Sequence, residues 1–115
     1  MTIQQPYHRP PELFCGYERQ PDTAPVNYPV ACSPQAWATG SIFQFLQIIV
    51  NLLPEAHNNC LRIVEPKLPD SLSSLSLYNL RVGSTLLNLE FERSGEVTSC
   101  RVAKKRGNLR VIIEA

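Results

Sequence analysis

Glu12 is the residue of this 115-residue chain whose type and setting most suggest chemistry. It lies in the segment RPPELFCGY, residues 9–17, where two prolines precede it and a glycine follows. Proline restricts the backbone at its own position and at the one before, and glycine permits a sharp turn, so we expect a stiff loop that holds the carboxylate in place. A fixed carboxylate beside aromatic side chains suits sugar chemistry, in which it can remove a proton from water.

This loop and a second segment, YPVACSPQAWA at residues 28–38, resemble the C-terminal part of bacterial amylo-alpha-1,6-glucosidases. These enzymes are glycoside hydrolases of the glycogen-debranching type. The resemblance extends from about Pro6 to Ala115 and includes LPD at residues 68–70 and LRVG at residues 80–83. It implies a six-hairpin (α/α)6 barrel, of which this chain would be a fragment with a C-terminal β extension.

The resemblance also implies that Glu12 is the catalytic general base. Water deprotonated by Glu12 would attack the anomeric carbon with inversion, while a separate general acid, ~6.5–9.5 Å away, protonates the leaving oxygen. That acid belongs to an earlier loop of the barrel, and neither Glu18 nor Asp22 stands in a matching motif. We therefore expect the chain to be inactive alone in the hydrolysis of glycogen or another α-glucan. The alternative for Glu12 is an exposed carboxylate paired with Arg9 or Arg19.

Four further residues are candidates for binding the substrate. The resemblance places Gln35 and Trp37 at the rim of a sugar pocket, where an amide can bond hydroxyl groups and an indole can stack on a pyranose ring. For Trp37 a place in the apolar core is an equally good interpretation. Tyr28 and Phe14 are weaker candidates for sugar stacking, because aromatic packing under the loop explains them equally well.

Three regions of one partial domain, residues 1–115, would position these residues. Residues 1–32 hold six of the ten prolines and predict an extended but ordered loop. A helix is predicted over residues 33–53, with Ser33 as N-cap, Pro34 in the first turn and Pro54 marking its end. From residue 60 to about 114 the period of apolar residues is two, which predicts five strands in an antiparallel meander with one buried face.

The predicted helix carries no charge and is apolar around most of its circumference. We reject a membrane span, because the stretch contains three amides and no basic cluster flanks it. Such a helix needs neighbours on nearly all sides, and this sequence offers no second long helix. Its expected neighbours are therefore a separate N-terminal barrel chain or other copies of this chain.

Composition argues against nucleic-acid, membrane and metal binding, and the N-terminal sequence predicts the cellular compartment. A net charge of +1 gives no argument for nucleic acid or an anionic membrane as partner. The basic run of residues 104–106 precedes Gly107 and Asn108, and it predicts a solvated hairpin tip. The four cysteines and two histidines show no metal-ligand spacing, so no metal or cofactor is expected. The N-terminus lacks a secretory signal, which predicts a cytoplasmic protein with free thiols rather than two disulfides.

Two functions are compatible with these features. The first is the incomplete glycoside hydrolase, acting on α-glucan when the rest of the barrel is supplied. The second is a non-catalytic module that binds sugar or associates with itself, in which the aromatic residues serve binding only. An enzymatic assay with a Glu12→Gln variant would distinguish the two.

Overall fold

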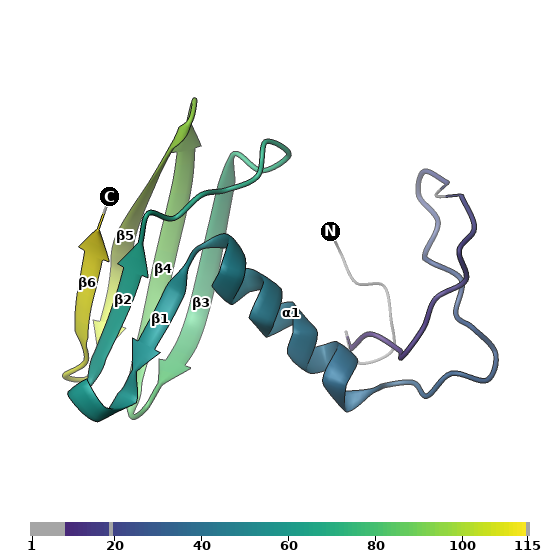
Figure 1. The fold of residues 1–115 in the computed structure, drawn as a ribbon, viewed down its shortest axis with the longest axis horizontal. Coiled ribbons are helices and arrows are strands. Elements are labelled where there is room, and N and C mark those ends of the chain that lie inside the picture. The colour runs from purple at the N-terminus through teal and green to yellow at the C-terminus, as the bar shows by residue number, and fades with distance from the viewer. Residues whose placement is uncertain (1–8, 19, 115) are drawn as a thin grey trace. The chain divides into compact units, whose positions relative to one another are not determined.

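The computed structural model describes residues 9–18 and 20–114 of the chain (Figure 1). The chain divides into two compact units, and the boundary between Phe45 and Leu46 falls inside its helix. The first unit carries every residue that the sequence nominated for chemistry. The second unit contains all of the strands.

The described part of the first unit is a proline-rich loop followed by most of the helix. Residues 9–18 and 20–35 form no helix or strand apart from an isolated antiparallel bridge between Phe14 and Asn27. Six prolines in this region remove backbone donors and fix φ, which prevents continuous helix or sheet. The loop is nonetheless held by backbone hydrogen bonds between segments far apart in sequence. The first eight residues of the loop expected over residues 1–32 lie outside the described residues, as does Arg19.

The helix α1 spans Ala36–Ile49 and is shorter than the sequence predicted. The expected helix over residues 33–53 is wrong at both ends. It begins at Ala36 rather than directly after Ser33. It stops at Ile49 because Asn51 has a left-handed backbone with φ of 47° and the chain then becomes a strand. The Asn51 side chain donates to the carbonyl oxygen of Val64 at 2.6 Å, and the Val64 N–H donates back to the Asn51 carbonyl at 3.3 Å. These bonds replace the helical continuation. At 14 residues α1 is ~21 Å long.

One sheet of the second unit has the strand order β1-β2-β6. β1 (Leu52–Glu55) and β2 (Cys60–Val64) are antiparallel and are joined by the 3-10 helix η2 (Ala56–Asn58). β6 (Arg110–Glu114) lies parallel to β2 on its other side. Pro54, which was expected to stop a helix, lies inside β1. An edge strand tolerates proline, because one side of it makes no ladder bonds.

The other sheet is an antiparallel meander with the order β3-β4-β5. It consists of β3 (Ser74–Val82), β4 (Thr85–Ser94) and β5 (Val97–Arg106). Gly83 and Gly95 lie in its two turns with φ of 58° and 62°, a conformation that glycine adopts without strain. Figure 1 shows the two sheets facing each other in the second unit.

The expected five-stranded meander over residues 60–114 is therefore wrong in its pairing. Only its middle three strands pair as a meander, whereas β2 and β6 lie together in the opposite sheet. Two stacked sheets bury both inner faces, which a single sheet of this size cannot do. The basic run was also misplaced. Residues 104–106 end β5, and the turn follows them at Gly107.

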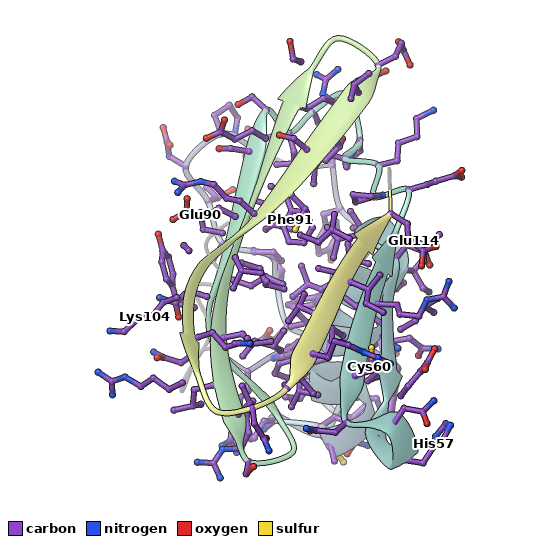
Figure 2. The ribbon with its side chains drawn as sticks, turned by 90° about the vertical axis from the view of Figure 1, so that its left-hand side faces the viewer. His57, Cys60, Glu90, Phe91, Lys104 and Glu114 are labelled. Carbon is purple, nitrogen blue, oxygen red and sulfur yellow. The ribbon has the colours of Figure 1, made fainter. Side chains whose placement is uncertain are left out.

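The core lies between the two sheets. Its fully buried side chains come from both of them, and Phe91 of β4 is the largest at 1% exposure. Figure 2 shows Phe91 between the sheets and Cys60 on β2. Burying one such side chain stabilises the fold by about 1.5–3 kcal/mol. The cluster consists of Val50, Leu52, Leu61, Ile63, Leu68, Leu87, Leu89, Phe91 and Leu109.

This architecture corrects the expected fold class. The described chain is a small β-rich structure with one 14-residue α-helix and six strands in two sheets. It is not a fragment of an (α/α)6 barrel with a long inner helix and a β extension. The apolar run ending at Leu53 suggested such a helix, but Leu52 belongs instead to the core of the sandwich. No helix among the described residues has the length and apolarity needed to cross a membrane.

Candidate functional site

Glu12 is fixed to a segment twenty residues away in the sequence. Its backbone N–H donates to the Cys32 carbonyl at 2.8 Å. The Cys32 N–H donates in turn to the Glu12 carboxylate oxygen Oε2 at 3.4 Å. Pro11 is buried beside it and Glu12 itself is half-buried. The loop therefore holds this carboxylate through both its backbone and its side chain.

The start of α1 is tied to the same loop. The Gln35 N–H donates to the Pro10 carbonyl at 3.2 Å, two residues before Glu12. The Gln35 side-chain oxygen accepts the N–H of Ala36 at 3.1 Å, so it satisfies one of the free donors of the first helical turn. Its amide nitrogen makes no hydrogen bond within the described residues. Residues 9–17 are thus joined to residues 28–38 through Pro10 as well as through Glu12.

A short two-stranded contact extends this arrangement. Phe14 and Asn27 form the antiparallel bridge, and the Cys15 N–H donates to the Val26 carbonyl at 2.8 Å on one side of it. On the other side the Tyr28 N–H and the Leu13 carbonyl are 3.5 Å apart. Phe14 and Tyr28 are therefore carried by neighbouring backbone segments in the first unit.

The aromatic candidates are exposed rather than buried. Trp37 has 60% of its surface exposed, Tyr28 47% and Phe14 40%. This argues against the interpretation of Trp37 as a core residue. Large aromatic side chains that remain in water are available for stacking on a ligand.

No second acidic residue is joined to Glu12 in the described part of the first unit. Glu18 and Asp22 are exposed there and make no hydrogen bond or ion pair with another described residue. Glu12 forms no ion pair with Arg9, so that alternative is not supported. Arg19 lies outside the described residues. The arrangement offers one fixed carboxylate, which suits a base without its acid.

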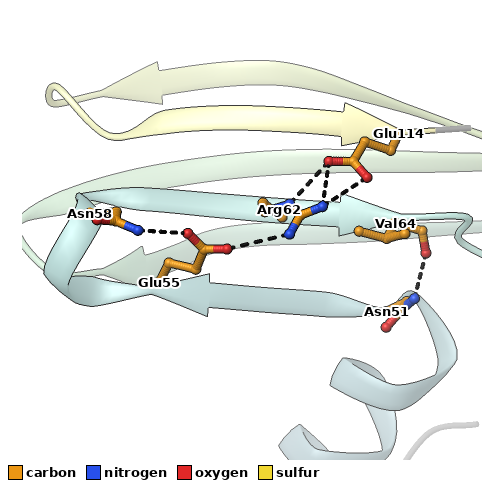
Figure 3. Close-up of polar contacts among 6 residues, drawn as sticks. All are labelled: Asn51, Glu55, Asn58, Arg62, Val64 and Glu114. Atoms are coloured by element: carbon orange, nitrogen blue, oxygen red, sulfur yellow. Dashed lines mark hydrogen bonds and ion pairs between the residues drawn. The ribbon is translucent and has the colours of Figure 1, made fainter.

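Several acidic residues of the second unit serve its fold. Figure 3 shows Arg62 of β2 between Glu114 of β6 and Glu55 of β1. The guanidinium reaches Glu114 at 2.7–3.0 Å and Glu55 at 3.6 Å. Glu114 raises the pKa of Arg62, and the bond from Asn58 with the Arg62 charge lowers the pKa of Glu55. Asp70 pairs with Arg93 and Glu90 with Arg101 in the same way.

No family model matches this chain. No curated protein and no solved structure matches it either. Any assignment of function therefore rests on the residues themselves.

Metal and thiol chemistry find no support in the described residues. They contain no group of three or more histidine, cysteine or acidic side chains that could hold a metal ion. His57 is exposed on η2, and His8 lies outside the described residues. All four cysteines are free. Burial raises the pKa of the Cys100 thiol to about 11, which makes it a poor nucleophile at neutral pH.

The second unit also contains a hollow that the sequence did not suggest. It has a volume of about 580 Å³ and lies where the last turn of α1 meets the chain after β2. Its lining includes Glu65, Asp70, Glu96 and Lys67, together with apolar residues such as Ile48. The lining comes from three separate stretches of the chain, residues 48–51, residues 65–70 and Glu96, which the fold brings together.

Proposed function

We propose that this chain acts in the hydrolysis of α-1,6-linked glucan, with Glu12 as the general base. The observation that carries the proposal is the pair of bonds between Glu12 and Cys32, which fixes the carboxylate beside the segment leading to Trp37. Because the described chain is not a barrel fragment, the proposal depends on the first unit alone.

In this reaction Glu12 takes a proton from water, and the resulting hydroxide attacks the anomeric carbon of the sugar. The glycosidic bond breaks on the opposite face, and a general acid gives its proton to the leaving oxygen. We propose that this acid comes from another polypeptide chain, because Glu18 and Asp22 are exposed and not fixed in the described loop. The reaction inverts the configuration at the anomeric carbon and needs no cofactor.

The exposed aromatic residues would hold the glucan. Trp37 and Tyr28 can stack on pyranose rings, and Phe14 offers a further apolar surface near Glu12. The free amide nitrogen of Gln35 can donate to a sugar hydroxyl. We place the reaction in the cytoplasm, where reducing conditions keep the four cysteines free.

A second candidate function is a module that binds α-glucan without catalysis. The exposure of Trp37, Tyr28 and Phe14 favours it, since stacking alone can bind sugar. Self-association is the other form of this candidate, favoured by the exposed Phe43 and Phe45 on α1. Both forms use the aromatic surface and leave Glu12 without a chemical role.

α-Glucosyl fluoride distinguishes a base from a binding module. Fluoride leaves without being protonated, so hydrolysis of this substrate needs the base but not the missing acid. We expect the purified chain to release fluoride and β-glucose, to leave α-1,6-glucan intact, and to lose about 10²-fold or more of the fluoride activity in Glu12→Gln.

The matched control is Glu18→Gln, which removes an exposed carboxylate from the same loop and should leave the fluoride activity unchanged. Binding is followed through Trp37, the only tryptophan of the chain, whose emission should change when α-1,6-linked oligosaccharide is added. Binding with equal fluoride release by the wild type and Glu12→Gln would support the non-catalytic module. Hydrolysis of the glucan itself by the isolated chain would show that the acid is present.

A further inference from the structure

The outer face of the β3-β4-β5 sheet brings three basic side chains together. Arg81 of β3 and Arg106 of β5 both pair with Leu86 of β4, so the three residues form one row across the sheet. Lys104 pairs with Asn88, two residues further along each strand. Residues two apart on a strand point to the same face. Figure 2 shows Lys104 and Glu90 on the side of this sheet away from Phe91.

Residues 104–106 belong to β5, so their side chains alternate between the two faces of the sheet. Lys104 and Arg106 are exposed on the outer face. Lys105 lies between them and uses its ammonium group to donate to the Leu109 carbonyl at 3.0 Å, where it supports the turn into β6. The run is therefore not a single solvated tip. Two of its three charges join Arg81 on one surface.

These three charges have no acidic partner within the described residues. Arg81, Lys104 and Arg106 take part in no ion pair there. The acidic residue nearest to Asn88 on β4 is Glu90, two positions further on, and its charge is neutralised by Arg101. The outer face therefore carries three uncompensated positive charges at one end. Such a surface attracts anions.

A small hollow lies among these residues. It measures about 50 Å³ and is lined by Asn79, Leu86, Asn88, Lys104 and Arg106. The Asn79 N–H, in the bulge of β3, donates to the Asn88 side-chain oxygen at 3.0 Å. This bond orients the Asn88 amide and leaves its N–H groups as donors. Lys104, Arg106 and the Asn88 amide thus offer positive charge and hydrogen-bond donors to the hollow, beside the apolar Leu86.

We propose that this hollow binds a phosphate group. Arginine and lysine form strong, charge-assisted hydrogen bonds to phosphate, and arginine can bind two of its oxygens at once. Three neighbouring strands span only ~10 Å, so the surface fits one phosphate better than the backbone of a nucleic acid. All of its residues lie in the second unit. The proposal is therefore independent of the role assigned to Glu12.

The test is a titration of the intact chain followed by amide NMR signals, with inorganic phosphate and glucose 6-phosphate as two separate probes and sodium chloride at equal ionic strength as reference. We expect saturable shifts at residues 79–88 and 104–106 with phosphate but not with chloride. Tighter binding of glucose 6-phosphate would assign the site to a phosphorylated sugar, and equal binding would assign it to free phosphate.

A double variant, Lys104→Gln with Arg106→Gln, should weaken phosphate binding about tenfold or more. The matched control is Lys67→Gln with Arg110→Gln, which removes two exposed charges elsewhere in the second unit and should retain the affinity. Both variants keep the substituted positions polar, and unchanged signals of the core would confirm that each is folded. Equal weakening in the two variants, no difference between phosphate and chloride, or binding that grows with the length of an oligonucleotide would overturn the proposal.

Discussion

The two units of this chain are built in opposite ways. The first is held by a few backbone hydrogen bonds and leaves its aromatic side chains in water, with Trp37 60% exposed. The second buries a continuous apolar cluster between two sheets, with Phe91 1% exposed. Stability comes from burial, whereas binding needs accessible groups. The comparison indicates that the second unit supplies most of the stability and the first supplies the candidate chemistry.

The largest expected effect comes from replacing a phenylalanine in each unit. Phe91→Ala should lower the free energy of unfolding by about 3–5 kcal/mol, because it leaves a cavity in the buried cluster between the two sheets. Phe43→Ala should change it by less than about 0.5 kcal/mol, since this side chain is 67% exposed. Urea unfolding measures both values. Similar losses in the two variants would contradict the comparison.

A glycine in each unit gives the next largest contrast. Gly107 has φ of 131°, and a Cβ there would come within 2.9 Å of the Thr85 Cα. Gly107→Ala should therefore cost about 2–4 kcal/mol through strain and crowding. Gly16 has nothing within 4 Å of such a Cβ, so Gly16→Ala should be close to neutral. Thermal unfolding of the two variants tests the difference, and a neutral Gly107→Ala would mean that this turn can relax.

Much of the β structure could be predicted from the sequence, but its pairing could not. Alternating residues such as Leu87, Leu89 and Phe91 marked strands near their actual positions. β1 was missed because Leu52 continues the apolar run of the helix and Pro54 resembles a helix stop. The parallel pairing of β2 with β6 joins residues fifty apart. Local periodicity carries no information about such a partner.

The candidate site was predictable to a similar degree. The sequence singled out Glu12 from its prolines, yet nothing in the spacing indicated that its partner would be the backbone of Cys32. The basic surface was missed because residues 104–106 were expected to form a hairpin tip rather than to continue a strand. A strand continued to Arg106 would have placed Lys104 and Arg106 on one face and Lys105 on the other.

A buried and an exposed threonine test the comparison more finely. Thr98 is buried, and its hydroxyl oxygen accepts the Leu68 N–H at 3.0 Å. Thr98→Ala leaves that buried donor unpaired and should cost about 1–3 kcal/mol. The exposed Thr23 hydroxyl donates to the Gln20 carbonyl at the same distance, but water can replace it. Thr23→Ala should therefore have little effect on the urea midpoint, and an equal loss would contradict the account.

The smallest expected effect is a pH dependence at Glu55. Its pKa is lowered below 4.5, first by the bond from Asn58 and then by Arg62. Ionised Glu55 therefore stabilises the folded chain above that value, and the stabilisation is lost as the pH falls through the folded pKa. The difference in urea midpoint between the wild type and Glu55→Gln should be larger at about pH 6 than at about pH 3. A difference that does not change with pH would contradict this assignment.

Hydrogen exchange across the chain, with and without α-1,6-linked oligosaccharide, tests the central claim most directly. Without sugar, the amides of β2, β4 and β5 should exchange slowly and those of the first unit quickly. Sugar should slow exchange at Glu12, Cys15 and Gln35, whose N–H groups hold the loop together, and leave the second unit unchanged. If the loop amides do not respond to the sugar, or if the added protection falls in the sheets instead, the first unit does not bind the glucan.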